Sequence, residues 1–159
     1  MKSYYVSTPS RLCLFGEHQD YLGLEVIAAA IDLRFSARIN RRADMMVLID
    51  IRDKSINALG QANTQGLYQR YVIDLSINIL LRNGYVLDSG FDIKMDSTIP
   101  IGKGMCSSST MTIVFIKALL EAIEHKDAQN AELIARLAFA AEVTEFSEPG
   151  GMMDHYTSA

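Results

Sequence analysis

The sequence contains no tryptophan, three prolines and only two cysteines among 159 residues. Cys13 and Cys106 cannot build a disulfide framework, and their spacing lacks the Cys-x-x-Cys pairs of common zinc and redox sites. They therefore predict reduced thiols and a cytoplasmic chain. The N-terminus lacks the apolar segment of a secretion signal. No run approaches the roughly 18 apolar residues of a membrane span, so no membrane association is expected.

An excess of positive charge is also missing. Lysine and arginine number 15 against 19 aspartate and glutamate residues, which gives a formal net charge of −4. This balance offers no basic surface for nucleic acid. The 49% hydrophobic and 21% charged composition excludes a disordered, collagen-like or coiled-coil chain. The length predicts one domain, residues 1–159, that buries a core of its own.

The order of periodic segments predicts an α+β fold. Apolar or alternating runs predict strands over residues 4–6, 12–15, 26–31, 35–39, 45–51 and 90–95. Helical spacing predicts helices over 66–82, 111–124 and 127–146, with Asp127 as the N-cap of the last. Residues 53–65 and 99–110 are expected to be loops. Because most strands precede the helices, layered α+β packing is favoured over strict βαβ alternation.

The second loop carries a candidate phosphate site. Gly102 and Gly104 allow the backbone to bend and approach a ligand closely. Small hydroxyl residues follow and open a helix, whose free amides and positive end attract anions. The loop is not a Walker A motif, because Lys103 lies between the two glycines. An ordinary glycine- and serine-rich helix entry, with a solvated Lys103, is the alternative interpretation.

Two further clusters carry ionisable residues. The first, Arg11, Glu17, His18, Asp20 and Tyr21, lies around the end of an apolar run, and such carboxylates and imidazoles suit a ligand rich in hydroxyl groups. Near the C-terminus a glycine-rich turn presents Asp154, which could act as a general base. Taken singly, both clusters also fit solvent-exposed charged turns, and Glu142 also fits the wet edge of a helix.

Together the three clusters resemble the GHMP kinases, most closely the galactokinase branch. Residues 9–21, PSRLCLFGEHQDY, are similar to the galactokinase signature PGRVNLIGEHTDY. Residues 100–110 resemble the family's phosphate loop, P-x-G-x-G-L-S-S-S-A. Residues 141–154 resemble a third segment that begins with A-E and ends in G-x-M-D, matched here by Gly151, Met152, Met153 and Asp154.

The resemblance implies a two-layer fold like that of ribosomal protein S5 and ATP-dependent phosphorylation of a sugar hydroxyl. It implies Asp154 as catalytic base and Arg11 as the cation that neutralises charge and keeps the base ionised. It implies Mg²⁺ at Ser108 and Glu142, and sugar contacts from Glu17, His18, Asp20 and Gly151. The ATP loop would consist of Gly102, Lys103, Gly104, Met105, Cys106, Ser107 and Ser108.

Several positions depart from these motifs. Ser10 and Cys13 replace Gly and Asn of the signature, and Gln19 replaces its Thr. Cys106 and Ser109 replace Ser and Ala in the phosphate loop, and His155 replaces the usual Gln after the base. Because Gln19 and His155 lie near the expected sugar position, a sugar related to galactose, or a uronic acid, is an open alternative to galactose itself.

Length is the other departure. GHMP kinases form two domains and are about twice as long, whereas this chain ends five residues after Asp154 without the family's third glycine motif. The sequence therefore predicts a fragment, namely an N-terminal domain that lacks its second domain and is inactive alone, with an uncovered apolar face that favours self-association. A complete short protein is the alternative interpretation of the length. The alternatives are a sugar- or nucleotide-binding module or regulator without turnover, and a structural domain without a ligand.

Overall fold

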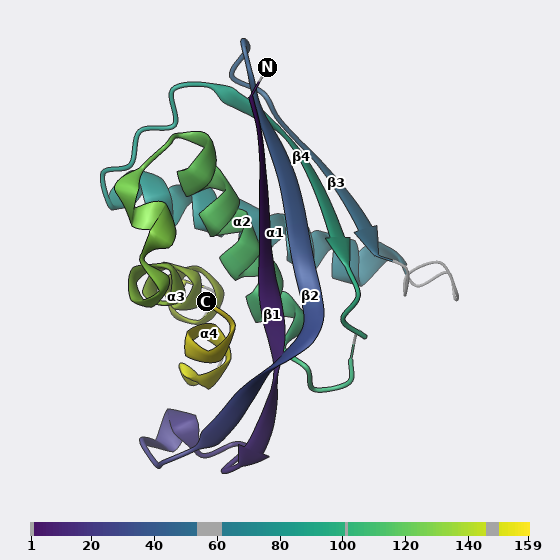
Figure 1. Ribbon diagram of the computed structural model, residues 1–159, viewed down its shortest axis with the longest axis vertical. Coiled ribbons are helices and arrows are strands. Elements are labelled where there is room, and N and C mark those ends of the chain that lie inside the picture. Colours follow the sequence, from purple (N-terminus) through teal and green to yellow (C-terminus); the bar gives the residue numbers. More distant parts are fainter. Residues whose placement is uncertain (1, 54–61, 101, 146–149) are drawn as a thin grey trace.

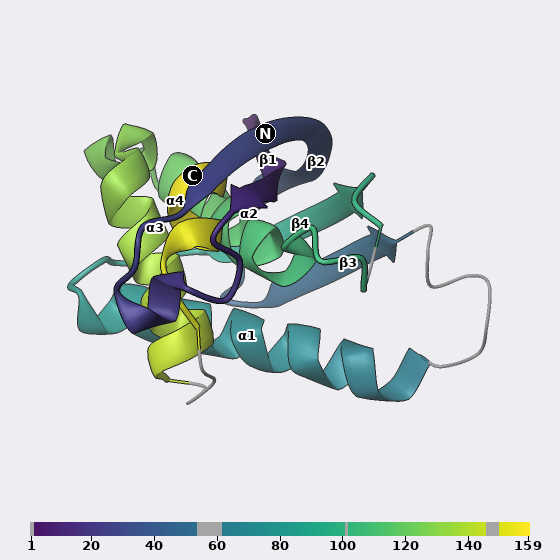
Figure 2. The same ribbon diagram turned by 90° about the horizontal axis from the view of Figure 1, so that it is seen from below.

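The chain folds into a helical layer on a curved four-stranded sheet, which confirms the α+β prediction (Figures 1 and 2). The structure is a computed structural model that describes residues 2–53, 62–100, 102–145 and 150–159. The strand order is β1-β2-β4-β3. The bounds are Ser3–Phe15 for β1, Ile27–Arg42 for β2, Val47–Asp53 for β3 and Gly90–Ser97 for β4.

The first two strands are longer than the sequence predicted. Each is continuous where two short apolar runs suggested two strands. They pair antiparallel, and the register shifts between Pro9 and Ser10. Such an irregularity accommodates a proline, which has no amide hydrogen to donate. β2 pairs antiparallel with β4, and β3 pairs parallel with β4.

The first two helices begin earlier than predicted, whereas the first of them ends at residue 82 as predicted. α1 is Ala62–Arg82 and α2 is Ser107–Ala122. Both begin four residues early, because the start of α1 was assigned to a loop and the small residues 107–110 already form the first turn of α2. Of the predicted loop 53–65, residue 53 ends β3 and residues 54–61 lie outside the described part.

The predicted helix 127–146 is divided into three segments. A 3₁₀ turn, η3 (Lys126–Gln129), precedes α3 (Ala131–Phe139), which continues into the π-helical turn η4 (Ala140–Thr144). The N-cap of α3 is Asn130, whose Oδ1 accepts the Leu133 amide hydrogen at 3.1 Å. The predicted cap, Asp127, instead accepts a hydrogen bond from the Tyr85 hydroxyl at 2.8 Å. Residue 146 is not described.

The core lies between the sheet and α2. Alternate residues of the strands face inward, so that Val6, Ala37 and Met95 lie in register across three strands. α2 is buried along most of its length and packs against β1, β2, α1 and α3. A short helix near the C-terminus, α4 (Met153–Ser158), contacts α2, α3 and β1. Among the described helices none is long and apolar enough to cross a membrane.

This packing positions the candidate site. The β1–β2 hairpin extends past the helical layer, and its turn contains the 3₁₀ segment η1 (Asp20–Leu22) (Figure 1). α4 and the start of α2 lie against β1 near that end. Three segments that are far apart in the sequence are therefore neighbours in space.

Candidate functional site

A cavity of about 450 Å³ opens where the hairpin turn, α2, η4 and α4 meet. It is lined by Arg11, Glu17, His18, Asp20, Tyr21, Ser108, Ser109, Glu142, Val143, Gly150, Gly151, Met153, Asp154 and His155. All three sequence clusters contribute to this lining. Every residue predicted to be catalytic, to bind sugar or to hold metal is among them.

Arg11 and Asp154 form an ion pair at the cavity wall. Arg11 Nε and Nη2 lie 2.7 and 2.6 Å from the same oxygen, Asp154 Oδ1. Arg11 is buried, whereas 26% of the Asp154 side chain is exposed. Since only Oδ1 is used by the guanidinium, Oδ2 has no bond to Arg11 in the part of the chain that the structure describes.

Burial and charge act in opposite directions on this pair. Burial raises the pKa of Asp154 above its ordinary value, and the positive charge of Arg11 only partly opposes the rise. Burial acts to lower the pKa of Arg11, but the Asp154 carboxylate outweighs it, so that the pKa of Arg11 is raised. The guanidinium therefore stays charged, and the carboxylate beside it becomes a stronger proton acceptor than a solvated aspartate.

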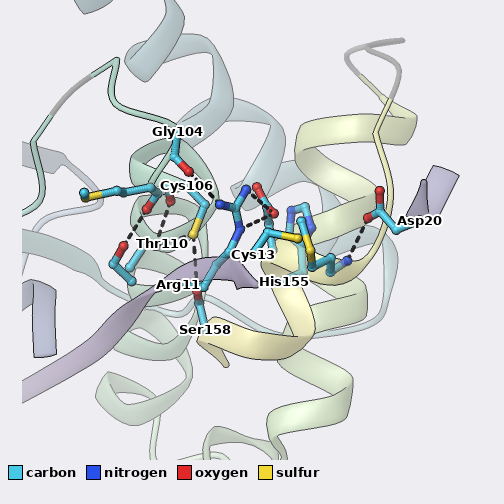
Figure 3. A network of polar contacts seen from close by, with 12 residues as sticks. Arg11, Cys13, Asp20, Gly104, Cys106, Thr110, His155 and Ser158 are labelled. Carbon is cyan, nitrogen blue, oxygen red and sulfur yellow. Dashed lines mark hydrogen bonds and ion pairs between the residues drawn. The ribbon is translucent and has the colours of Figure 1, made fainter. Parts of the chain in front are cut away.

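The predicted phosphate loop lies beside the cavity. Positive φ angles at Gly102 (68°), Gly104 (69°) and Cys106 (48°) make every second residue left-handed. Arg11 Nη1 donates to the Gly104 carbonyl oxygen at 2.6 Å, which links the loop to the ion pair (Figure 3). Of the seven residues predicted for the ATP loop only Ser108 lines the cavity, while Gly102, Lys103, Gly104, Met105, Cys106 and Ser107 do not.

The last loop residues are tied to the surrounding helices. The Cys106 sulfur lies 3.4 Å from both Thr110 Oγ1 and Ser158 Oγ (Figure 3). Burial raises the pKa of the Cys106 thiol, which favours the protonated form. Neither Cys106 nor Cys13 forms a disulfide, as the sequence predicted. The thiol therefore packs the loop against α4, the helix that carries Asp154.

Glu142 and His155 form a second, deeper pair. Glu142 Oε2 lies 2.9 Å from His155 Nε2, and the side chains are 8% and 2% exposed. Burial acts to raise the pKa of Glu142, but the hydrogen bonds and charge from His155, with hydrogen bonds from Ser108 and Ser109, outweigh it and lower the pKa. An ionised carboxylate only accepts, so His155 Nε2 donates. His155 Nδ1 is buried and has no hydrogen-bond partner among the described residues.

The π-helical turn explains where Glu142 lies. η4 widens the helix that continues from α3, and Glu142 is one of its buried residues. Such turns insert one residue and often occur at functional sites, because they redirect side chains. Glu142 is consequently not on the wet edge of a helix. The regular helical pattern of the sequence gave no signal for this turn.

Asp20 links the hairpin turn to α4. Its Oδ2 accepts the backbone amide hydrogen of Met153 at 3.1 Å, and Oδ1 accepts that of Tyr21 at 3.0 Å. A Cβ atom at Gly151 would overlap the Asp20 carboxylate, so a side chain there would force Asp20 to move. Asp20 and Gly151, both predicted to contact the sugar, are thus adjacent, and their sugar contacts stay a prediction. Asp20 in addition holds the N-terminus of the helix that carries Asp154.

Glu17 and His18 lie in the exposed part of the hairpin turn. The turn is closed by a hydrogen bond from the Gln19 amide to the Gly16 carbonyl oxygen at 3.0 Å. His18 adopts a positive φ of 65°, which is uncommon for a residue with a side chain. Both side chains line the cavity and can reach a polar ligand within it.

The donor set for a metal is small. No group of three His, Cys, Asp or Glu side chains that could hold a metal occurs in the described ranges. Mg²⁺ does not need one, since it commonly takes one or two protein ligands and completes its shell with water and phosphate oxygens. An ionised Glu142 close to the Ser108 hydroxyl fits that requirement.

Sequence reasoning missed three features of the site. The pairing of His155 with Glu142 was not predicted, although His155 was noted as a departure next to Asp154. Ser109 and Val143 line the cavity without having been proposed as site residues. Ser10, another noted departure, donates from β1 to the carbonyl oxygen of Met105. For this contact, the sequence offered one signal, namely a hydroxyl residue where the motif has glycine.

Comparison with known proteins agrees with these segments. Residues 70–159 match the GHMP kinases N-terminal domain, and residues 2–41 match the galactokinase galactose-binding signature. A galactokinase of Staphylococcus carnosus is 30% identical over 156 residues, which are 93% of this chain and 39% of that protein. A mevalonate kinase of Methanocaldococcus jannaschii is 29% identical over 86% of this chain and 46% of its own length.

Solved structures show the same fold. The galactokinase of Lactococcus lactis, crystallised with galactose, superposes with a TM-score of 0.79 at 20% identity, over 98% of this chain and 41% of that one. The Methanococcus jannaschii mevalonate kinase superposes with a TM-score of 0.76 at 24% identity, over 98% of this chain and 50% of that one. The chain thus spans less than half the length of the curated relatives named above. The chain belongs to the GHMP kinase superfamily and has the fold of its N-terminal domain.

Proposed function

We propose that residues 1–159 are the ATP- and sugar-binding domain of a kinase that transfers the γ-phosphoryl group of ATP to a sugar hydroxyl. The observation that carries the proposal is the position of Arg11, which is bonded both to Asp154 and to the Gly104 carbonyl oxygen of the loop. One cation thus lies between a candidate base and a candidate phosphate site. Phosphoryl transfer asks a protein for this positioning and charge neutralisation.

Asp154 is the proposed base. Its pKa is raised and its side chain is partly open to the cavity, so it can accept the proton of an incoming hydroxyl through its free oxygen. Arg11 holds the other oxygen, orients the carboxylate and compensates the negative charge that accumulates around the transferred phosphoryl group. Arg11 lies in β1 and Asp154 in α4, so the two elements each supply one member of the pair.

The loop and α2 are proposed to bind the nucleotide. Gly102–Ser108 would surround the phosphates with backbone amides at the N-terminus of a 16-residue helix. Ser108 and Glu142 would hold Mg²⁺. The ion would supply positive charge to the phosphate oxygens. His155 keeps the Glu142 carboxylate fixed and ionised in this buried position.

The hairpin turn is proposed to bind the sugar. Glu17, His18 and Asp20 offer acceptors and a donor for hydroxyl groups, and the missing side chain of Gly151 accommodates the Asp20 carboxylate. Galactose is the first candidate, because residues 2–41 match a galactose-binding signature. Related hexoses and uronates are further candidates, because Gln19 and His155 depart from the galactokinase motif.

A non-catalytic sugar- or nucleotide-binding module is the second candidate. It is favoured by the departures from the galactokinase motif near the expected sugar position, namely Gln19 and His155. In that case the cavity binds sugar and the loop binds nucleotide, but no phosphoryl transfer follows.

The test is sugar-dependent ADP release from MgATP, measured with galactose, related hexoses, arabinose and uronates, together with the binding of each sugar by calorimetry. For the kinase we expect release with one sugar, and a fall of about 10²–10⁴-fold in Asp154→Asn with sugar affinity retained. Sugar binding without release, unchanged in Asp154→Asn, would support the second candidate. Absence of both binding and release would contradict both candidates.

A further inference from the structure

The hydroxyl of Ser10 connects β1 to the proposed phosphate loop, residues 102–108, by a hydrogen bond. Ser10 lies in β1, is 0% exposed and donates from Oγ to the Met105 carbonyl oxygen at 2.5 Å. The next residue, Arg11, donates to the preceding carbonyl oxygen of the loop, that of Gly104. Two consecutive strand residues therefore bind two consecutive loop carbonyls.

These two bonds fix the direction of the loop amides. In a planar trans peptide the C=O and the following N–H point in opposite directions, and no described peptide is cis. With the Gly104 and Met105 carbonyls pointing at β1, the amide hydrogens of Met105 and Cys106 point away from it. β1 thus turns two donors toward the side of the loop that it does not cover.

The oriented amides continue into those of α2. The first amides of a helix have no carbonyl partner within the helix, and Thr110 is the first residue of α2 whose amide bonds back, to the Cys106 carbonyl oxygen. Left-handed backbone at Gly102, Gly104 and Cys106 curves the loop. Successive amides in such a curve form a concave anion site.

We propose that Ser10 is a positioning residue for the nucleotide phosphates, since it presets the Met105 and Cys106 amides for an anion. The inference rests on the proposed function of the loop. The galactokinase signature has glycine at this position, and glycine has no side chain that could make this bond. The clamp from Ser10 is consequently a property of this chain's own departure from the motif.

The experiment compares Ser10→Ala with Thr8→Val by NMR titration of the chain with MgADP. Thr8 is the matched control, because it is a buried β1 hydroxyl that donates to an α2 carbonyl, that of Thr110, at 3.3 Å, outside the loop. We expect Ser10→Ala to weaken MgADP binding about tenfold. Thr8→Val should change it less than about twofold. Sugar affinity should be unchanged in both variants, because neither side chain lines the cavity.

A second measurement covers the unliganded state. The ¹⁵N order parameters of the Met105 and Cys106 amides should fall in Ser10→Ala but not in Thr8→Val, because only the first releases the loop. If wild type binds MgADP and Ser10→Ala binds equally well, the inference is wrong and the proposed function stands. Equal weakening in both variants also overturns it. Absence of MgADP binding to wild type would contradict the nucleotide role of the loop itself.

Discussion

Two of the carboxylates that line the cavity, Asp154 and Glu142, lie in contrasting surroundings. Asp154, partly exposed, is paired with a permanent cation, yet its pKa is raised, because burial exceeds the effect of Arg11. Glu142 is more deeply buried and is paired with an imidazole, yet its pKa is lowered. Burial acts to raise the pKa of both carboxyl groups. The difference lies in the hydrogen bonds that each accepts from its neighbours.

This contrast separates two chemical roles. A carboxylate that accepts several hydrogen bonds stays ionised and suits a fixed negative charge, such as a metal ligand. A carboxylate whose pKa is raised, with one oxygen free, suits proton transfer. When the environments of two neighbouring groups shift their pKa values in opposite directions, the two groups commonly have different roles in the chemistry. The proposed roles of Glu142 and Asp154 follow this division.

Breaking the Arg11–Asp154 pair should have the largest effect on stability. Arg11→Met leaves Asp154 without its cation in a largely buried position, and we expect a loss of about 3 kcal/mol, measured by urea unfolding. The matched background is Asp154→Asn, in which the same substitution should cost clearly less, because no charge is then left unpaired. An equal cost in both backgrounds would mean that Arg11 stabilises the fold through Gly104 and packing alone.

Breaking the Glu142–His155 pair should have the next largest effect on stability. His155→Leu removes the donor to Glu142 and should cost about 2 kcal/mol in the free energy of unfolding. His155→Gln, which introduces the residue usual in the family motif, retains an N–H donor and should cost less than about 1 kcal/mol. If the two variants unfold at the same urea concentration, the hydrogen bond to Glu142 contributes nothing and only ring packing, against Phe139, matters.

The smallest effect is expected in the pH dependence of stability, where Glu142 and Asp154 act in opposite directions. The pKa of Glu142 is lowered on folding, so its contribution is present above its ordinary pKa of 4.5 and is lost as the pH falls through the folded value. The pKa of Asp154 is raised from 3.8, so its contribution has the opposite sign and stability is regained as the pH falls. Glu142→Gln should therefore make the acid-side loss of stability shallower, and Asp154→Asn should make it steeper.

Thermal unfolding between pH 6 and pH 3 measures both slopes. Wild type and both variants are compared in the same buffers, so that the other titrating groups cancel. Slopes that change in the same direction in both variants would contradict the assigned pKa directions.

Local patterns predicted the elements better than their limits. The alternation in β4 and the apolar spacing in α2 gave the correct element types, because each depends on a side-chain period. The continuity of β1 and β2 was missed, because cross-strand bonding carries both strands past Pro9 and the polar residues around it. The division of the last helix was missed as well, since Asn130 and the π-helical turn depend on local hydrogen bonds rather than on the apolar period.

For the candidate site, the sequence likewise predicted the participating residues but not their contacts. Motif spacing identified residues of the hairpin turn, the loop and α4, and these do line or adjoin one cavity. It could not indicate that Arg11 contacts Gly104, that Asp20 binds the Met153 amide, or that His155 faces Glu142. Each of these contacts joins residues separated by 13 to 133 positions, and none follows from the residue types alone.

The family, the α+β class and the ionisable residues available for chemistry follow from the sequence alone, because they depend on composition, period and motif. The packing of distant segments sets which carboxylate is held by the Arg11 guanidinium and which by the His155 ring. It also sets which loop carbonyls point at β1. These outcomes depend on where distant segments meet when the sheet and helices pack, and burial there sets the balance of desolvation and hydrogen bonding for each group.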